Sequence, residues 1–179
     1  TVMVHERKDL IMSHDSFLIR PATDQDIDEI VRIRIKLREY EEKCNRNLWR
    51  MSEKEIKGLP AKFKGYIEDE NARLVVAEDA DANRIIGLGL GRVQFHDSYI
   101  PGKSGKIDDI WVDEDYRRKG ICKRIVKTLL EFFSDKGVEV ICLNYVKGNS
   151  FAEIVWPNLG FKDSLIFAQA DLNEVLERL

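Results

Sequence analysis

The sequences IDDIWV at residues 107–112, RRKGIC at 117–122 and NSFAEIVWPNLGF at 149–161 together decide the fold. The first is rich in β-branched and aromatic residues and predicts a strand. Apolar residues then recur at helical spacing from 121 to 133 and predict an amphipathic helix. The strand and the helix meet near residues 117–120, so this basic turn opens the helix.

The basic turn has the properties of an anion-binding site. First-turn amides of a helix lack internal partners and point outward with the positive end of the helix dipole. Gly120 allows a ligand to approach the backbone closely. Positive side chains surround it, namely Arg117, Arg118, Lys119 and Lys123. Cations at a helix N-terminus oppose the dipole unless an anion is present, so the pattern favours a pyrophosphate or a phosphorylated ribose over the alternative, a solvated basic turn.

The motif Arg117-x-x-Gly120-x-Cys122 resembles the acetyl-CoA pyrophosphate loop of the GNAT N-acyltransferase superfamily. A second motif, Asn149-x-x-Ala152 followed by an aromatic residue and Leu-Gly-Phe at 159–161, resembles the other half of that family's pattern. The two motifs stand in the family's order, separated by one predicted helix and one predicted strand. The resemblance covers about residues 16–170, and it implies acetyl-CoA as cosubstrate and no metal.

Two positions depart from the family pattern. Cys122 replaces the second small residue of the loop, and we expect it to pack toward the interface between helix and sheet. Trp156 stands where many members carry a tyrosine that protonates the departing sulfur, and an indole N–H has no useful acidity near neutral pH. A thiol with a pKa of roughly 8.5 leaves with little help, and Tyr145 or an ordered water could supply the proton.

The predicted elements give the fold class α/β (α+β). Strands are predicted at 17–20, 73–78, 85–95, 107–112, 138–144 and 166–170. Helices are predicted from residue 23 or 24, in two short segments within 52–69, and at 121–136, 150–156 and 171–179. An antiparallel first half and a parallel crossover give a mixed sheet with helices on both faces. The resemblance implies a GNAT-like, mostly antiparallel central sheet with a splayed parallel pair.

Two features of these elements leave alternatives open. Gly87, Gly89 and Gly91 share one face of the strand at 85–95, which leaves room for a ligand or for a packed helix. Only one strand is predicted after residue 160, where the family has two. The sequence therefore leaves open where the last strand lies and whether it is exchanged between subunits.

Length and composition indicate one domain. The 179 residues are 44% hydrophobic and 34% charged, which suits a single globular unit. We assign residues 15–179 to one acyl-CoA N-acyltransferase domain and residues 1–14 to a leader or tag-like segment that is poorly ordered. Within the domain we find no repeat, low-complexity tract or linker.

Charge and cysteine usage narrow the partners and the compartment. A formal net charge of −3 without a long basic tract argues against nucleic-acid binding. No apolar run approaches the roughly 20 residues of a membrane span, so we predict no membrane association and a cytoplasmic location. The three cysteines have no paired C-x-x-C spacing and predict neither a disulfide framework nor a zinc site. A homodimer is expected from the family resemblance alone.

The acidic pair Asp108 and Asp109 lies on the strand just before the basic turn. An acceptor amine arrives protonated, so the site must bind the ammonium and remove a proton. Strand alternation predicts the two carboxylates on opposite faces. The pair also resembles the acidic pair of polyamine and diamine acetyltransferases, which makes Asp108 the first candidate for amine contact or base and Asp109 a structural group. The alternative is that both are solvated or ion-paired.

Together these patterns predict an acetyl-CoA-dependent N-acetyltransferase that transfers an acetyl group directly to a primary amine, either a small, polyamine-like amine or a protein amine. The alternatives are a noncatalytic acyl-CoA-binding regulatory module, a transferase for a longer acyl group, and a nucleotide-binding protein. The predicted catalytic residues are Asp108 and Tyr145. The predicted cofactor-binding residues are Ile110, Trp111, Val112, Arg117, Arg118, Lys119, Gly120, Ile121, Cys122, Lys123, Asn144, Asn149 and Trp156.

Overall fold

The computed structural model describes residues 17–46 and 50–179, so the predicted leader at 1–14 lies outside the described residues. Five strands form one sheet in the order β1-β2-β3-β4-β5. Their bounds are β1 (Phe17–Pro21), β2 (Ala72–Asp79), β3 (Arg84–Phe95), β4 (Lys103–Val112) and β5 (Ile141–Leu143). Strands β1 to β4 pair antiparallel, and β4 pairs with β5 in parallel. This confirms the predicted mixed sheet with a parallel crossover.

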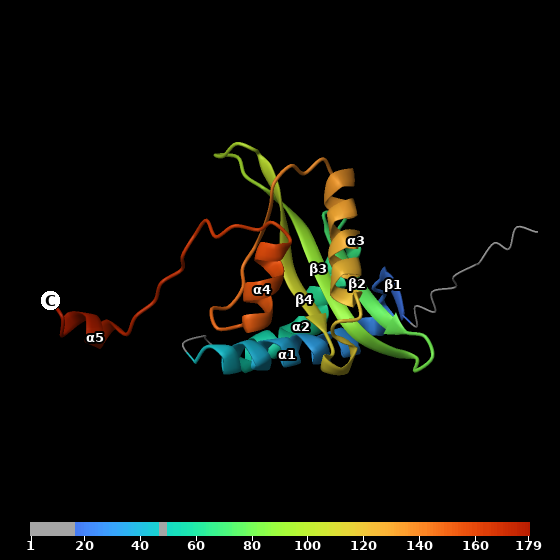
Figure 1. Cartoon of the computed structure of the whole chain (residues 1–179), viewed down its shortest axis with the longest axis horizontal. Helices are drawn as coiled ribbons and strands as arrows, with labels where there is room; N and C mark the ends of the chain where they lie inside the picture. The colour runs from blue at the N-terminus through green and yellow to red at the C-terminus, as the bar shows by residue number, and fades with distance from the viewer. Residues whose placement is uncertain (1–16, 47–49) are drawn as a thin grey trace, which may run out of the picture.

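Helices cover both faces of the sheet (Figure 1). Their bounds are α1 (Ile27–Cys44), α2 (Glu53–Glu68), α3 (Ile121–Asp135), α4 (Ser150–Asn158) and α5 (Leu172–Leu176), with short 3-10 turns η1 (Asp24–Asp26) and η2 (Glu114–Tyr116). One core cluster packs α1 and α2 against the sheet, and the other packs α3 and part of α4 against the opposite face. The sheet therefore has an α1/α2 face and an α3 face.

Three glycines of β3 allow α3 to lie close to the sheet. A Cβ on Gly89 would lie 2.3 Å from the Cγ2 atom of Ile125, and one on Gly91 would lie 2.8 Å from the ring of Phe133. Gly87 faces the same helix, with the Cδ1 of Ile125 at 3.3 Å. Of the two alternatives for this glycine face, the structure shows helix packing.

We predict that Gly89→Ala lowers the free energy of unfolding by about 1–3 kcal/mol, because the added methyl overpacks the contact with Ile125. Gly58→Ala is the matched control, since nothing lies within 4 Å of a Cβ at that exposed position of α2. Alanine favours helix over glycine by roughly 0.5–1 kcal/mol, so the control should stabilise the fold. Urea denaturation of both variants checks the opposite signs.

The buried carboxylate of Asp26 fixes the backbone at the start of α1. Asp26 accepts hydrogen bonds from the backbone N–H and the hydroxyl of Thr23 at 2.7 and 3.0 Å. It also accepts two bonds from the guanidinium of Arg20, at 2.7 and 2.9 Å. The bond from Arg20 is the main reason that the pKa of Asp26 lies below its ordinary value of 3.8. Arg20 also donates to Glu78 of β2 at 2.6 Å, so β1, β2 and the start of α1 are held together.

We predict that Asp26→Asn costs about 2–4 kcal/mol of stability at neutral pH, because an amide presents a donor to Arg20 where a carboxylate oxygen accepted. A depressed pKa stabilises the fold above the unfolded-state value of 3.8, and this contribution is lost as pH falls through the folded-state pKa. The difference from the unsubstituted protein should therefore shrink in acid. Asp28→Asn, at an exposed position of the same helix, should change stability by less than about 0.5 kcal/mol at every pH.

The prediction of two short helices within 52–69 is wrong, because α2 is continuous. Ser52 caps the helix, since its hydroxyl accepts a hydrogen bond from the backbone N–H of Glu55 at 3.2 Å. Pro60 removes one donor but lies on the exposed side of the helix. Leu59 and Phe63 are both 2% exposed in the core, and their burial keeps the helix intact.

Two strand predictions in the second half also need correction. The strand predicted at 138–144 is only three residues long, because β5 pairs with residues 105–107 of β4 and then diverges. The strand predicted at 166–170 is absent from the structure described here, where residues 162–171 join no strand. Only part of the predicted terminal helix forms, with Asp171 as its N-cap. The β propensity of 166–170 has no neighbouring strand to pair with in this chain.

Candidate active site

A β-bulge in β4 places both acidic residues on the α1/α2 face. Leu90 lies opposite Asp109 and Gly91 lies opposite Ile107, so Asp108 is an extra residue in β4. Asp109 therefore shares the face of Leu90, which belongs to the α1/α2 core. Asp108 bonds to Arg92 on that same face. The prediction of opposite faces is wrong, since strand alternation holds only for a regular ladder.

Asp109 is the more buried of the two carboxylates. Its side chain is 12% exposed, and its Oδ1 lies 3.3 Å from the Nε of Arg34 on α1. Burial raises the pKa of Asp109 above its ordinary value, the charge of Asp108 adds to the rise, and Arg34 opposes it. A carboxylate with a raised pKa is a stronger base than an exposed one.

Asp108 is already held by an arginine. Its two oxygens accept hydrogen bonds from Nε and Nη2 of Arg92 at 2.6 and 2.8 Å. The guanidinium of Arg92 in turn lies over the ring of Tyr66 on α2, 5.3 Å from the ring centroid. Lys106 is also near, at 3.9 Å from Oδ1. Both oxygens of Asp108 are thus engaged by one guanidinium, whereas Asp109 has a single, longer contact with Arg34.

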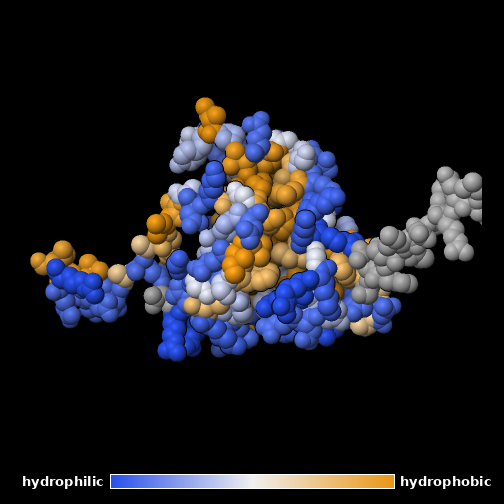
Figure 2. Space-filling view, in the orientation of Figure 1, coloured by the Kyte–Doolittle hydropathy of each residue, from blue (hydrophilic) through white to orange (hydrophobic). Residues whose placement is uncertain are grey.

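The edge of β4 next to these acids is open. Pairing with β5 ends at Ile107, while β3 pairs with β4 as far as Val112. The amide of Asp113 donates to Ile86 on β3, and amides alternate along a strand. The amides of Ile110 and Val112 therefore face the open edge, whereas that of Trp111 faces β3. In Figure 2, hydrophobic side chains gather between α3 and α4, beside this edge.

The loop before α3 has an exposed, left-handed backbone. Gly120 is the N-cap of α3 with φ at +83°, and nothing lies within 4 Å of a Cβ built on it. The first turn begins with the bond from the Arg124 amide to the Gly120 carbonyl, so the amides of Ile121, Cys122 and Lys123 precede it. Arg118 also has a positive φ, +61°. The geometry fits a diphosphate that approaches these amides.

The side chains of the loop divide between solvent and core. Arg118, Lys119 and Lys123 are exposed. Cys122 packs on the α3-side core as predicted, and burial raises the pKa of its thiol. Ile121 is 1% exposed, so only its amide can meet a ligand.

Arg117 turns into the protein rather than toward the loop amides. Its Nε donates to the carbonyl of Val112 at 3.0 Å. Its guanidinium lies 5.1–5.8 Å from the ring centroids of Tyr40, Trp111 and Phe151. Arg117 thus joins α1, the end of β4 and α4 across the open edge.

The candidate residues near β5 and α4 have local partners. The hydroxyl of Tyr145 donates to Asp163 at 3.1 Å, and this hydrogen bond raises its pKa. Asn149 is the N-cap of α4, and its side-chain oxygen accepts a hydrogen bond from the amide of Ala152 at 3.1 Å. Asn144 is exposed just after β5.

Both candidate tryptophans have their side chains in the core. Trp156 is 8% exposed and packs edge-on against Phe161, with 5.4 Å between ring centroids. Trp111 lies in the α1/α2 core and donates its indole N–H to Asp113 at 3.0 Å. The structure brings Asp108, Asp109 and the backbone of residues 110–112 together, with the Gly120 loop following the same strand.

Sequence reasoning missed the two arginines beside the acidic pair. Arg34 comes from α1 and Arg92 from β3, and both are far from residues 108 and 109 in the sequence. The Nη1 of Arg34 is buried and has no hydrogen-bond partner among the described residues. Burial also raises the pKa of Glu41, which lies near Arg34 and Arg38. No local sequence pattern marks these long-range partners.

Two features of the described residues bear on other functional classes. Within residues 17–46 and 50–179, no group of three or more His, Cys, Asp or Glu side chains could hold a metal ion. Among the helices that the structure describes, none is long and apolar enough to cross a membrane. The cytoplasmic location stays a prediction from the sequence.

Comparison with known proteins agrees with this geometry. A thialysine N-ε-acetyltransferase from Sus scrofa is 29% identical over 154 residues, which are 83% of this chain and 85% of that protein. N-acetyltransferase 8 from Homo sapiens is 27% identical over 99 residues, and these cover 55% of this chain but only 42% of the human protein.

Solved structures share the fold. The BH1408 protein from Bacillus halodurans superposes with a TM-score of 0.74 at 23% identity, covering 87% of this chain and 99% of that one. A predicted acetyltransferase from Clostridium acetobutylicum, solved with acetyl-CoA, gives a TM-score of 0.69 at 20% identity and covers 88% and 97% of the two chains.

The sheet opens between its parallel strands, next to the Gly120 loop that caps α3. This is the arrangement expected of the N-acyltransferases that the sequence resembles. The profile of the acetyltransferase (GNAT) family matches residues 34–161, and the chain belongs to that family. The noncatalytic alternative is therefore set aside, and the chain is an N-acetyltransferase by class.

Proposed function

We propose that this protein transfers an acetyl group from acetyl-CoA directly to a primary amine. The observation that carries the proposal is the pair Asp108 and Asp109 on one face of β4, beside the open edge of the strand. A carboxylate there can receive the acceptor's ammonium while the thioester lies against the strand.

The donor would lie between the Gly120 loop and the open edge of β4. The exposed amides at the start of α3 and the free space around Gly120 suit the diphosphate. Lys119 and Lys123 would add positive charge. Arg117 would act indirectly, because its hydrogen bond to the carbonyl of Val112 holds the end of β4 in place. The amides of Ile110 and Val112 would donate to the acetyl carbonyl and stabilise the charge that develops on its oxygen.

Asp109 is our proposed base. It takes a proton from the ammonium, the amine nitrogen attacks the acetyl carbon, and the carbon–sulfur bond breaks as the tetrahedral intermediate collapses. The nitrogen, which carries a positive charge after the attack, loses its second proton to solvent, so that a neutral amide is released. CoA leaves as a thiolate, whose conjugate acid has a pKa of roughly 8.5. The hydrogen bond to Asp163 raises the pKa of Tyr145, which weakens it as the acid for this step. We therefore propose that the thiolate is protonated from solvent.

We propose a small molecule with a flexible aminoalkyl chain as the acceptor. The support is the name of the Sus scrofa relative, together with the partly buried position of Asp109, which a thin chain reaches more readily than a folded protein surface does.

The test is release of CoA thiol from acetyl-CoA in the presence of thialysine, lysine, a polyamine and a peptide with a free N-terminus. We expect turnover that depends on the acceptor and is fastest with a small amine. Longer acyl-CoA donors and protection by ATP in a thermal-shift assay test the remaining alternatives. Binding of acetyl-CoA without turnover on any amine would contradict the proposal.

A further inference from the structure

Arg92 of β3 and Lys106 of β4 form a cation pair beside the two acids. They lie directly opposite one another in the antiparallel ladder, so their side chains project from the same face of the sheet. Like charges at directly opposed positions destabilise a sheet. Asp108 offsets one of the two charges, because both of its oxygens accept hydrogen bonds from Arg92. The Nζ of Lys106 lies 3.9 Å from Oδ1 of Asp108, which is beyond hydrogen-bonding distance.

The neighbouring ion pairs do not remove this excess of positive charge. Asp109 lies beside Arg34, and Lys62 of α2 donates to Glu55 at 2.9 Å, so each of these cations has a carboxylate of its own. The cation pair is left with one carboxylate between its two members. The side chain of its arginine is 32% exposed and that of its lysine 27% exposed, so an anion from solvent can reach both.

The cation pair also keeps hydrogen-bond donors for a ligand. Nε and Nη2 of Arg92 bond to Asp108, and in the described part of the chain no group accepts a hydrogen bond from Nη1. Nor does any described residue accept one from the ammonium of Lys106. Cys142, which lies next to Lys106 on β5, is exposed, so this part of the face is open to solvent.

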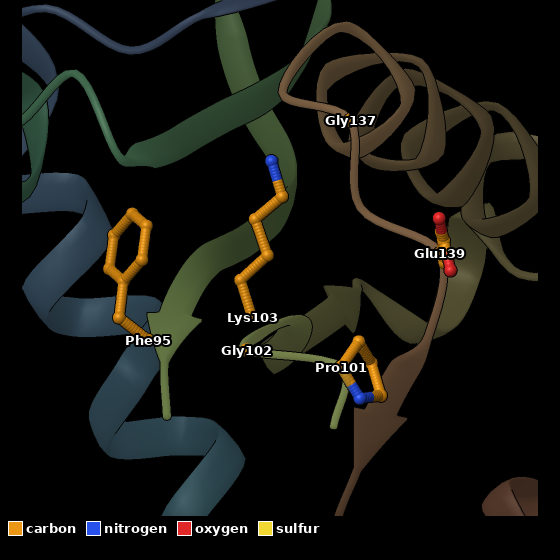
Figure 3. A pocket seen from close by; sticks show the side chains of 6 residues that line it. All are labelled: Phe95, Pro101, Gly102, Lys103, Gly137 and Glu139. Carbon is orange, nitrogen blue, oxygen red and sulfur yellow. The ribbon is translucent and has the colours of Figure 1, made fainter. Parts of the chain in front are cut away.

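Lys103, the other lysine of β4, lies on the opposite face and has a structural partner. Its Nζ donates to the carbonyl of Lys136 at the end of α3, at 2.6 Å. Figure 3 shows its side chain between those of Phe95 and Glu139. The carboxylate of Glu139 makes this place a poorer anion site than the cation pair. The pocket there has a volume of about 310 Å³ and is lined by Phe95, Pro101, Gly102, Lys103, Gly137 and Glu139.

The cation pair lies at a defined distance from Asp109. Leu90 lies opposite Asp109 and Arg92 lies opposite Lys106, so the two positions on β4 are two residues of β3 apart, or about 7 Å. The bulge makes this possible, because Asp108 adds a residue to β4 without adding a step to the ladder. A lysine side chain, with its four-carbon stem, is about as long as this separation.

We propose that Arg92 and Lys106 bind a carboxylate at the far end of the acceptor, and that they thereby select ω-amino acids over polyamines. The inference rests on the proposed function, since it takes Asp109 as the residue that meets the amine. A carboxylate at the cation pair would accept hydrogen bonds from Nη1 of Arg92 and from Nζ of Lys106. The second ammonium of a polyamine would instead meet two positive charges there.

Three acceptors of similar length test this preference. ε-Aminocaproate carries a carboxylate, its amide carries a neutral group, and cadaverine carries a second ammonium. We expect kcat/KM, measured by release of CoA thiol, to be about ten- to hundredfold higher for ε-aminocaproate than for the other two, the range for a hydrogen bond to a charged group. Turnover with equal kcat/KM for all of them would overturn the carboxylate site and leave the proposed acetyl transfer standing. Absence of turnover with every amine would overturn both.

Two substitutions of one residue test whether the cation pair sets the preference. Lys106→Gln should lower kcat/KM for ε-aminocaproate about tenfold and leave that for its amide within about twofold, a selectivity that loss of the fold cannot mimic. Lys106→Glu should reverse the preference and make cadaverine the better acceptor. Lys103→Gln is the matched control on the other face, and it should leave the preference unchanged. Loss of the preference in Lys103→Gln, or an unchanged preference in both variants of Lys106, would overturn the assignment.

Discussion

Asp109→Asn should lower kcat by roughly 10²–10⁴-fold, the range typical for loss of a general base. The amide cannot take the proton from the acceptor's ammonium, although it is nearly the same size as the carboxylate. The KM for acetyl-CoA should stay close to that of the unsubstituted protein, because the Gly120 loop is left intact. Initial rates at saturating acceptor, measured against acetyl-CoA, separate these two parameters.

The pH dependence follows from the environment of Asp109. The base is active when deprotonated, so kcat should fall as pH drops through its pKa. Burial raises this pKa above 3.8, and the acid limb of the kcat profile should therefore lie above that value. In Asp109→Asn that limb should be missing from the remaining activity.

Asp108→Asn is the control on the neighbouring position. Its oxygens are bonded to Arg92, so we expect lower stability and a smaller loss of kcat than for Asp109→Asn. The opposite outcome is a larger loss of kcat for Asp108→Asn, together with an unchanged acid limb in Asp109→Asn. It would identify Asp108 as the base, as the sequence alone predicts.

Gly120→Ala should raise the KM for acetyl-CoA about ten- to hundredfold while kcat at saturating donor changes little. A methyl group would stand in the free space where the diphosphate is proposed to approach, and an L-residue at φ +83° costs about 1–2 kcal/mol. A substitution that weakens binding equally in the ground state and in the transition state raises KM and leaves kcat unchanged.

Gly160→Ala is a close match for this substitution. Gly160 also has a positive φ, +93°, and also has nothing within 4 Å of a built Cβ, but it follows α4 rather than preceding α3. The two variants should lose similar stability, and only Gly120→Ala should bind acetyl-CoA more weakly by calorimetry. If the two variants bind acetyl-CoA with equal affinity, the diphosphate does not lie at the Gly120 loop.

The elements that depend on local pattern were predictable from the sequence. The helical spacing from 121 to 133 predicted α3, and the basic turn at 117–120 indicated where it begins, because period and backbone preference act over a few residues. Ser52 likewise marked the start of α2. The continuity of α2 through Pro60 was not predictable locally, since it depends on the burial of Leu59 and Phe63 against a distant core.

The charged centre of the site was only half predictable. The acidic pair is visible in the sequence, but the bulge that turns both carboxylates to one face leaves no mark in composition or period. The choice of Arg34 and Arg92 as partners is set by tertiary packing, as is the inward turn of Arg117. Motifs thus indicated the candidate site, while packing determined which of the two acids is bonded to Arg92 and which lies near Arg34.

The bulge at Asp108 also bears on how such a chain can diverge. Deleting one residue between Asp109 and Val112, after the bulge, would rotate every later side chain and reverse which amides meet the open edge, so the length of this part of the strand is tightly constrained. The side chains around the acidic pair come from α1, α2 and β3, where substitutions leave that register untouched. New amine preferences can therefore evolve from these flanking elements while the machinery that handles CoA is inherited unaltered.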